Sequence, residues 1–230
     1  WPAEGSDPAR ILFTNAEGET IATPWERPTE STYTALVLGL PGGEMTDIHA
    51  QVRTAEGCLQ SQVRAVETGT IPLALPPVAF TAGDATAAGG FTATVLIEQN
   101  QRYVVVLDQR GRAVFGLEDN AFRATLSRDR RALIFDRPAM DWDQLATITR
   151  LPFDGSERTE VQAPGLHTDF VELPHGQGYA ALGWEVQEVE DVLYLGDTVV
   201  EIGPDGAVRE LWRAFDHFQP DPTAEWPSFR

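Results

Sequence analysis

Residues 104–114 read VVVLDQRGRAV: a β-branched run, a polar turn that contains Gly111, and the start of a second run. The same shape returns as ITRLPFDG at residues 148–155 and as VVEIGPDGAV at residues 199–208. Asp and Gly between two β-branched runs are typical of a hairpin turn. The turn glycines recur at a spacing of about 40–50 residues, the length of a structural repeat. These are Gly111, Gly155 and Gly206.

A second type of hairpin alternates with the first. Residues 124–134 read ATLSRDRRALI, and residues 170–180 read FVELPHGQGYA with the same arrangement of runs and turn. Two hairpins in each repeat make four strands, which is the unit of a β-propeller blade. An open meander or a sandwich is the alternative, because hairpins of any fold favour Asp-Gly turns. The regular alternation of two hairpin types favours blades.

The number of repeats indicates an incomplete ring. At this period, residues 91–230 hold two to three blades, whereas a propeller closes with roughly four to eight. An open arc would leave sheet faces and edges uncovered. We therefore expect a second polypeptide to supply the remaining blades.

The amino-terminal region has a different pattern of strands and turns. Residues 10–75 contain about six or seven alternating segments of the length and spacing found in small antiparallel sandwiches. We expect a β-sandwich domain at 1–80, a linker rich in small residues at 81–90 and the first blades at 91–230. A helical period is almost absent, which makes the fold class all-β. The clearest segments are Ile11–Thr14, Tyr33–Leu38, Ile48–Arg53, Gln60–Val66 and Ile71–Leu75.

The charge and the cysteine content exclude several classes of partner and of site. The net charge of −18 repels phosphate backbones, so we expect no nucleic acid and no anionic membrane surface as partner. No apolar stretch approaches the roughly 20 residues that span a bilayer. Cys58 is the single cysteine, which excludes an internal disulfide and a cysteine-rich metal site.

Both ends of the sequence give expectations about processing. Trp1-Pro2-Ala3 lacks an initiator methionine, which favours removal of an export signal and a periplasmic or secreted location; trimming is the alternative. We expect Asp216–Arg230 to be a loop, and a terminal arginine is what a trypsin-like protease leaves. The chain is then one product of a longer precursor, cleaved in this loop and still bound to its carboxy-terminal partner. A separately encoded subunit or an artificial boundary is the alternative.

The chain has four histidines, of which two are candidates for chemistry. His167 precedes a blade strand, and the loops that enter innermost strands line the channel of a propeller. Imidazole there can act as a base, a nucleophile or a donor to an anion. The alternative is a satisfied structural histidine whose tautomer is fixed by Asp169. His217 begins an irregular aromatic loop. His49 and His175 are expected to be structural or surface residues.

Other catalytic and cofactor motifs are missing. The sequence has no GxSxG elbow, HExxH, P-loop or GxGxxG after a strand. The turn Gly203-Pro204-Asp205-Gly206 offers an aspartate that could hold calcium, although Asp-Gly is ordinary hairpin chemistry. We predict no other metal or cofactor.

The run HTDFVELPHG at residues 167–176 resembles the HHDF-ELPDG element of the arylsulfotransferase family, whose members are six-bladed propeller enzymes. GDTVVEIGPDG at residues 196–206 resembles the family's GD-IVEID-DG strand pair. Leu211-Trp212 and Asp216-His217-Phe218 resemble the WEW…DH segment that follows it. Residues 10–75 resemble the fibronectin-type sandwich that precedes the propeller in many members.

The resemblance implies sulfuryl transfer from a phenolic sulfate ester to a phenol, without a nucleotide donor. His167 matches the first histidine of the element and is implied to donate to the transferring group; Thr168 replaces the second. Asp169 and His217 are then expected to bind the small aromatic substrate. The family's DW-H-N element, channel arginine and covalent histidine belong to later blades, which the partner polypeptide would supply.

Two other classes of function stay open. The propeller could be a binding or assembly module without chemistry. It could also catalyse a different reaction, such as hydrolysis, elimination or cyclisation, because propeller scaffolds support many chemistries.

Overall fold

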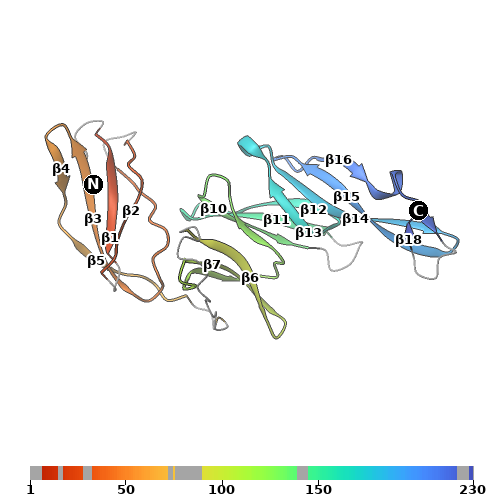
Figure 1. Ribbon diagram of the computed structural model, residues 1–230, viewed down its shortest axis with the longest axis horizontal. Helices are drawn as coiled ribbons and strands as arrows, with labels where there is room; N and C mark the ends of the chain where they lie inside the picture. The colour runs from red at the N-terminus through yellow and green to blue at the C-terminus, as the bar shows by residue number, and fades with distance from the viewer. Residues whose placement is uncertain are drawn as a thin grey trace. The chain divides into compact units, whose positions relative to one another are not determined.

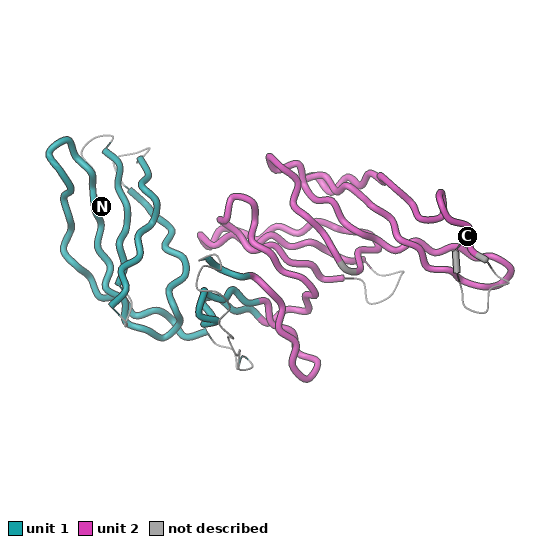
Figure 2. Tube along the Cα trace, in the orientation of Figure 1, with its two compact units in different colours: residues 1–92, 105–117 teal, residues 93–104, 118–230 magenta. Residues whose placement is uncertain are grey.

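The structure is a computed structural model of the chain (Figure 1). It describes residues 7–14, 18–27, 33–71, 75, 90–138, 145–221 and 228–229. The chain divides into two compact units, which Figure 2 distinguishes by colour. The first comprises residues 1–92 and 105–117, and the second comprises residues 93–104 and 118–230.

One antiparallel sheet dominates the first unit. Its central strand β3 pairs with β1 on one side, and with β4 and β5 on two successive stretches of the other side. Ala9, Phe13, Tyr33 and Ala50 are buried in this unit. The strands are β1 (Ala9–Thr14), β2 (Thr20–Ala22), β3 (Met45–Thr54), β4 (Gly57–Gln60) and β5 (Arg64–Glu67).

The sequence-based prediction for this unit needs two corrections. Tyr33–Leu38 has no regular secondary structure and pairs with no described strand. Gln60–Val66 is divided between β4 and β5, because the Ser61 hydroxyl accepts the Ala50 N–H at 2.8 Å and interrupts the strand ladder. Ile71–Leu75 lies mostly outside the described residues. The described residues form one five-stranded sheet, so the second layer of a sandwich stays a prediction.

Three further antiparallel sheets follow along the chain, each a meander in which consecutive strands are neighbours. None of these sheets closes on itself. The three-stranded sheet contains β6 (Thr92–Glu98), β7 (Gln101–Leu107) and β8 (Ala113–Glu118). The β9–β12 sheet contains β9 (Ala124–Leu126), β10 (Ala132–Arg137), β11 (Leu145–Pro152) and β12 (Thr159–Pro164). The β13–β16 sheet contains β13 (Leu166–Glu172), β14 (Tyr179–Val189), β15 (Val192–Ile202) and β16 (Val208–Arg213).

All five hairpins predicted in this region are present, and the all-β class is confirmed. Gly111, Gly155 and Gly206 have φ angles of +76°, +77° and +80°, in the left-handed region that glycine adopts without strain. An aspartate in each turn accepts a backbone N–H two residues later, which fixes the turn. The turn signals in the sequence therefore have a direct structural cause.

The remaining described elements are short. Two helical turns, η1 (Pro174–Gly176) and η2 (Ala214–Asp216), lie in the β13–β14 turn and after β16. Neither has the length or apolarity needed to cross a bilayer. The predicted loop Asp216–Arg230 contains a small strand pair, β17 (Pro220–Asp221) and β18 (Ser228–Phe229), so it is not wholly irregular.

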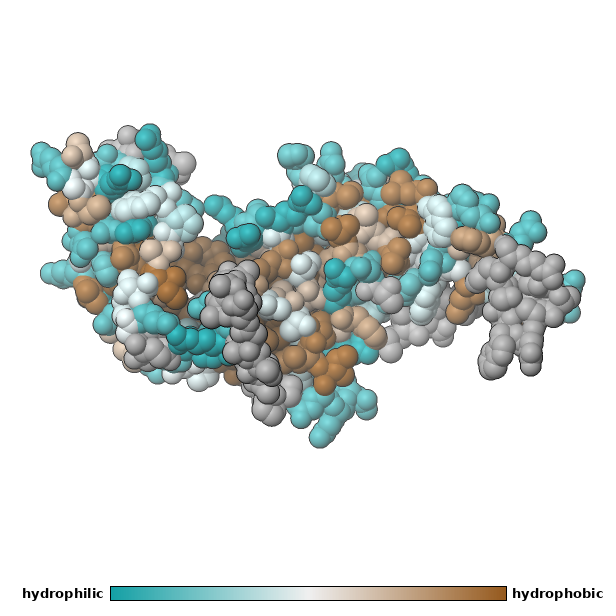
Figure 3. Space-filling view, viewed as in Figure 1, coloured by the Kyte–Doolittle hydropathy of each residue, from teal (hydrophilic) through white to brown (hydrophobic). Residues whose placement is uncertain are grey.

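The main hydrophobic core lies between the β9–β12 and β13–β16 sheets. The first contributes Ile134, Ala146, Ile148 and Ala163, and the second contributes Leu166, Phe170, Tyr179, Ala181, Val200 and Ile202. Strand β10 is buried on both faces, whereas only alternate residues of β14 and β15 are buried. In Figure 3, hydrophobic surface remains over the region that contains β15 and β16.

We predict that Ile148→Ala lowers the free energy of unfolding by about 2–5 kcal/mol, because the side chain is 1% exposed in this core. Leu145→Ala in the same strand is the control. Leu145 is 64% exposed, so its truncation should change stability by less than about 0.5 kcal/mol. Guanidinium denaturation measures both. Equal effects would mean that the two sheets do not pack through the Ile148 face.

Candidate functional site

The first residues of β13 form a wide bulge. Leu166 is opposite Gly183 and Phe170 is opposite Ala181, so four steps along β13 match only two along β14. Leu166 and Phe170 both enter the core, and the residues between them are pushed out of the ladder. Bulges of this kind re-aim side chains and are common beside functional sites.

Gly165 makes this bulge possible. Its φ of +68° is unfavourable for other residues, and its carbonyl accepts the Trp184 N–H at 2.9 Å. A Cβ at this position would lie 3.0 Å from the Trp184 nitrogen. The backbones of Gly165 and β14 therefore approach so closely that only glycine fits.

His167 is held by two neighbours from the adjacent hairpin. Its ring stacks on Trp184 with centroids 5.3 Å apart and planes 14° apart. Its Nε2 lies 3.1 Å from Asp197 Oδ1. Trp184 and Asp197 are opposite each other in the β14–β15 ladder, so they project from the same face. The side chain of His167 is 11% exposed, with both its plane and one nitrogen fixed.

Asp169 does not orient His167, because its carboxylate forms an ion pair with Arg123. Arg123 precedes β9 in the neighbouring sheet, and its guanidinium carbon lies 5.9 Å from the centroid of the Phe170 ring. Both charged side chains are nearly half exposed, so the pair contributes little to stability. It places a cation near the bulge. The tautomer-fixing role considered for Asp169 belongs to Asp197.

The buried carboxylate of Asp136 fixes the backbone of Arg123. Its Oδ1 accepts the N–H groups of Phe122 at 3.0 Å and Arg123 at 2.6 Å. Its Oδ2 is also buried and has no partner in the described part of the chain. Burial raises the pKa of the Asp136 carboxyl, although the two N–H donors oppose the shift. Asp136 is therefore a positioning residue for Arg123.

His217 is not brought to His167. It lies after β16, whereas His167 begins β13, and β14 and β15 separate these two strands. Three strand spacings amount to about 14 Å. The exposed ring of His217 stacks on Trp212, with centroids 5.4 Å apart and planes 9° apart. The arrangement gives His217 a packing role next to the outermost strand.

Comparison with known proteins gives no family assignment. The chain matches no protein-family model, no curated protein and no solved structure. The site must therefore be judged by its chemistry. The His167 imidazole, stacked on Trp184, and the Arg123 guanidinium, paired with Asp169, each adjoin the bulge of β13, and a carboxylate orients each basic group. Such donors suit an anionic group attached to an aromatic ring.

No metal centre is found in the part of the chain that the structure describes, where no three carboxylate, histidine or cysteine side chains gather. In the turn considered for calcium, Asp205 Oδ1 accepts the Ala207 N–H at 3.0 Å. This carboxylate therefore serves its own hairpin turn.

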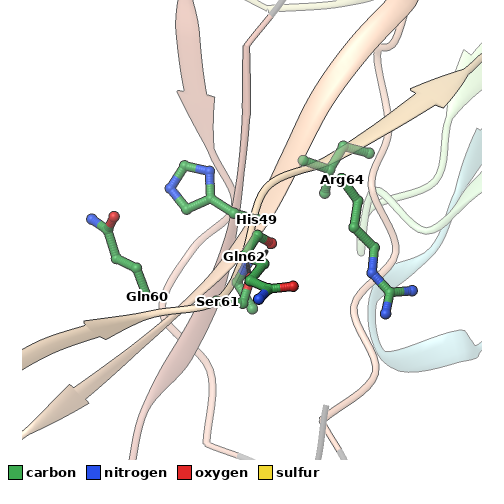
Figure 4. Close-up of a pocket in the computed structure, with 7 residues that line it drawn as sticks. His49, Gln60, Ser61, Gln62 and Arg64 are labelled. Atoms are coloured by element: carbon green, nitrogen blue, oxygen red, sulfur yellow. Dashed lines mark hydrogen bonds between the residues drawn. The ribbon is translucent and has the colours of Figure 1, made fainter.

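The other two histidines lie elsewhere. His175 is exposed in the η1 turn with a φ of 58°. His49 lines an open depression in the first unit, together with Gln60, Ser61 and Arg64 (Figure 4). In this view the guanidinium of Arg64 points away from His49 and Gln60. The depression belongs to the first unit, whereas the bulge of β13 belongs to the second.

We predict that the wild-type protein loses stability as pH rises and that Asp136→Asn abolishes this loss. The raised pKa of Asp136 means that the folded state binds its proton more tightly than the unfolded state. The wild-type protein therefore loses stability as pH rises from the ordinary aspartate range through the raised pKa. Asparagine keeps an oxygen acceptor for Phe122 and Arg123 without the charge. Denaturation midpoints of both proteins, measured from about pH 4 to pH 8, check this expectation.

Asp129→Asn is the matched control, because the contribution of Asp129 to stability should depend on pH in the opposite direction. The Ser127 hydroxyl is the main cause that lowers the pKa of Asp129, so its contribution to stability is lost as pH falls. If Asp136→Asn and Asp129→Asn shift the pH profile in the same direction, the proposed cost of the buried carboxylate is wrong.

Proposed function

We propose that the chain is part of an arylsulfotransferase-like enzyme that moves a sulfuryl group from a phenolic sulfate ester to a phenol. The covalent histidine of the reaction comes from a partner segment, and His167 assists it. The observation that carries this proposal is the constraint on His167 at the bulge of β13, between Trp184 and Asp197. The resemblance of residues 167–176 to the family element supports the same assignment.

The proposed architecture puts His167 beside a channel. The three meanders from β6 to β16 are blades of a six-bladed propeller, preceded by a fibronectin-like sandwich and a linker. Sheet order supports this arrangement, because β13 is an edge strand and comes first in its four-stranded meander. First strands are innermost in a blade, which directs residues at their entrance toward the axis.

The proposed reaction has two displacements. A nitrogen of the covalent histidine attacks sulfur, an N–S bond forms, and the S–O bond to the phenol breaks. The bonding electrons leave with the phenolate oxygen, which takes up a proton. The hydroxyl of the acceptor phenol then loses its proton and attacks sulfur, and the N–S bond breaks.

His167 and Arg123 serve the charge on the transferring group in this proposal. With Nε2–H directed to Asp197, a protonated His167 has Nδ1–H available for a sulfuryl oxygen. Arg123, held by Asp169 and by the backbone bond to Asp136, supplies a cation at the same end of the sheets. Donors fixed before the reaction stabilise the transition state without reorganising. A substrate contact by His217 stays a prediction.

An assembly module without chemistry is the second candidate. A broad apolar face of the β13–β16 sheet favours it, since exposed patches of this kind mark interaction surfaces. The two candidates differ in one observable. An assembly module binds its partner polypeptide but releases no phenol from a phenolic sulfate.

We predict that His167→Ala lowers turnover by roughly 10²-fold, the usual effect of removing one donor to a developing negative charge. The measurement is release of p-nitrophenol from p-nitrophenyl sulfate with phenol as acceptor, in the natural protein that contains this chain and its partner segment. His175→Ala is the control and should leave turnover unchanged, because His175 is exposed in the η1 turn. Equal losses from the two variants, or no turnover by the natural protein, would reject the proposal.

A further inference from the structure

We propose that the β14–β15 arm binds the apolar part of an aryl sulfate whose sulfate group lies at His167. The arm is the stretch Trp184–Asp197, in which the β14–β15 hairpin extends past the neighbouring strands. The substrate class is then aryl sulfates that carry an alkyl chain or a second ring, and single-ring esters bind more weakly. This inference rests on the proposed function, which assigns the sulfate group to His167.

The arm lies outside the four-stranded part of its sheet. Among the described residues, β13 pairs with Tyr179–Gly183 of β14, and β16 pairs with Thr198–Ile202 of β15. The hairpin itself continues as a ladder as far as Val189 and Val192, which are opposite each other. The described core between this sheet and the β9–β12 sheet includes no residue of the arm. The packing of one four-stranded sheet on another therefore does not account for the side chains of the arm.

One face of the arm contacts the end of β16 and η2. Arg213 forms an ion pair with Glu185, and Tyr194 on the same face is 4% exposed. Gly196 lies so close to Phe215 that a Cβ on the glycine would be 3.0 Å from the aromatic ring. A two-stranded ribbon alone is marginally stable in water, so these contacts are what hold the arm in place.

The opposite face of the arm is apolar and open. Val186 is opposite Leu195 in the ladder, and Leu193 lies two residues further along the same face. Leu193 and Leu195 are 61% and 58% exposed. We call these three residues the arm face. Adjoining exposed apolar side chains on a regular strand indicate a binding surface.

The arm face begins directly beside the candidate site. Trp184 stacks on the His167 ring, and Asp197 lies against its Nε2. These two residues form the pair next to Val186 and Leu195 in the ladder, so all four side chains project from one face. Successive pairs on one face of a sheet are about 7 Å apart, which is twice the rise per residue. An anion bound at Nδ1–H of His167 therefore has apolar side chains on the next two pairs.

The charges along this face define the ligand further. A protonated His167 lies at one end of the arm face, and Glu188 lies at the other end, opposite Leu193. The Glu188 carboxylate repels a second anionic group and leaves the uncharged part of a ligand on the leucines. The surface therefore fits an ester with one anionic end and an apolar body longer than a single ring.

The affinities of two sulfate esters for the natural protein that contains this chain test the proposal. Isothermal titration calorimetry without an acceptor gives the Kd of phenyl sulfate and of 4-hexylphenyl sulfate, at concentrations too low for micelles. We expect the hexyl ester to bind at least about 10-fold more tightly, because each methylene group removed from water adds to affinity. Leu195→Thr should reduce this ratio to about 3-fold or less, because it removes apolar surface beneath the chain.

Val192→Thr is the matched control for Leu195→Thr. Val192 belongs to the same strand and is 40% exposed, but it lies on the other face of the arm. Its replacement should keep the ratio of the two affinities. His167→Gln should weaken the binding of both esters by a similar factor, because it removes the cation that binds their shared sulfate group.

Four results would overturn the proposal. These are equal affinities of the two esters, a ratio that Leu195→Thr leaves unchanged, an equal loss of the ratio in Val192→Thr, and binding that His167→Gln does not weaken. Absence of binding by either ester counts with the first of these results, since the arm face then adds nothing to affinity.

The measurements of affinity require no turnover, so the two proposals can fail separately. A ratio that depends on Leu195, without release of p-nitrophenol from p-nitrophenyl sulfate, would reject sulfuryl transfer and leave the arm as a binding surface for aryl sulfates. Release of p-nitrophenol together with equal affinities of the two esters would reject the role of the arm alone.

Discussion

The contact between Ile134 and Ile148 on one sheet and Phe170 and Tyr179 on the next determines the rest of the second unit. It aligns two meanders face to face and fixes the position at which β13 begins relative to the β9–β12 sheet. Leu166 and Phe170 both enter this core, but they lie opposite Gly183 and Ala181, which are only two residues apart, so the chain between them cannot follow the ladder. His167 and Asp169 are displaced for that reason. The candidate site is thus a consequence of this register mismatch between β13 and β14.

Polar groups at this end of the sheets depend on the same contact. Arg123 and Asp169 come from different sheets and meet because the sheets are stacked. The carboxyl group of Asp136 lies in the interior, and its Oδ2 has no hydrogen-bond partner among the described residues. Burial of such a group is costly, and its hydrogen bonds from the backbone N–H groups of Phe122 and Arg123 offset part of this cost while they hold Arg123 in place. The stability of the interface and the geometry of the site are therefore linked.

The hairpins were predictable because each is encoded by a short local signal, such as Asp205 and Gly206 in a turn between β-branched runs. Tyr33–Leu38 has the alternation of a strand without a ladder partner, since alternation reports a half-buried segment and not its pairing. His167 could be selected from the sequence, but its partners could not. Asp197 reaches it through the register of a hairpin of two 11-residue strands, and Arg123 reaches Asp169 from the neighbouring sheet. The packing of one sheet on the next depends on contacts between residues that are distant in the sequence, which a local turn signal does not encode.

The meander order has a consequence for synthesis of the chain. Each strand pairs with the next, so the contacts within a sheet are local and do not wait for distant sequence. Each sheet can form soon after it leaves the ribosome, and the β13–β16 sheet then covers the β9–β12 sheet. Its other side carries apolar residues that are exposed in the described part of the chain, such as Leu193 and Leu195. Exposed apolar surface on a partly folded chain promotes aggregation, so the solubility of a growing chain is lowest while such a sheet face is open to solvent.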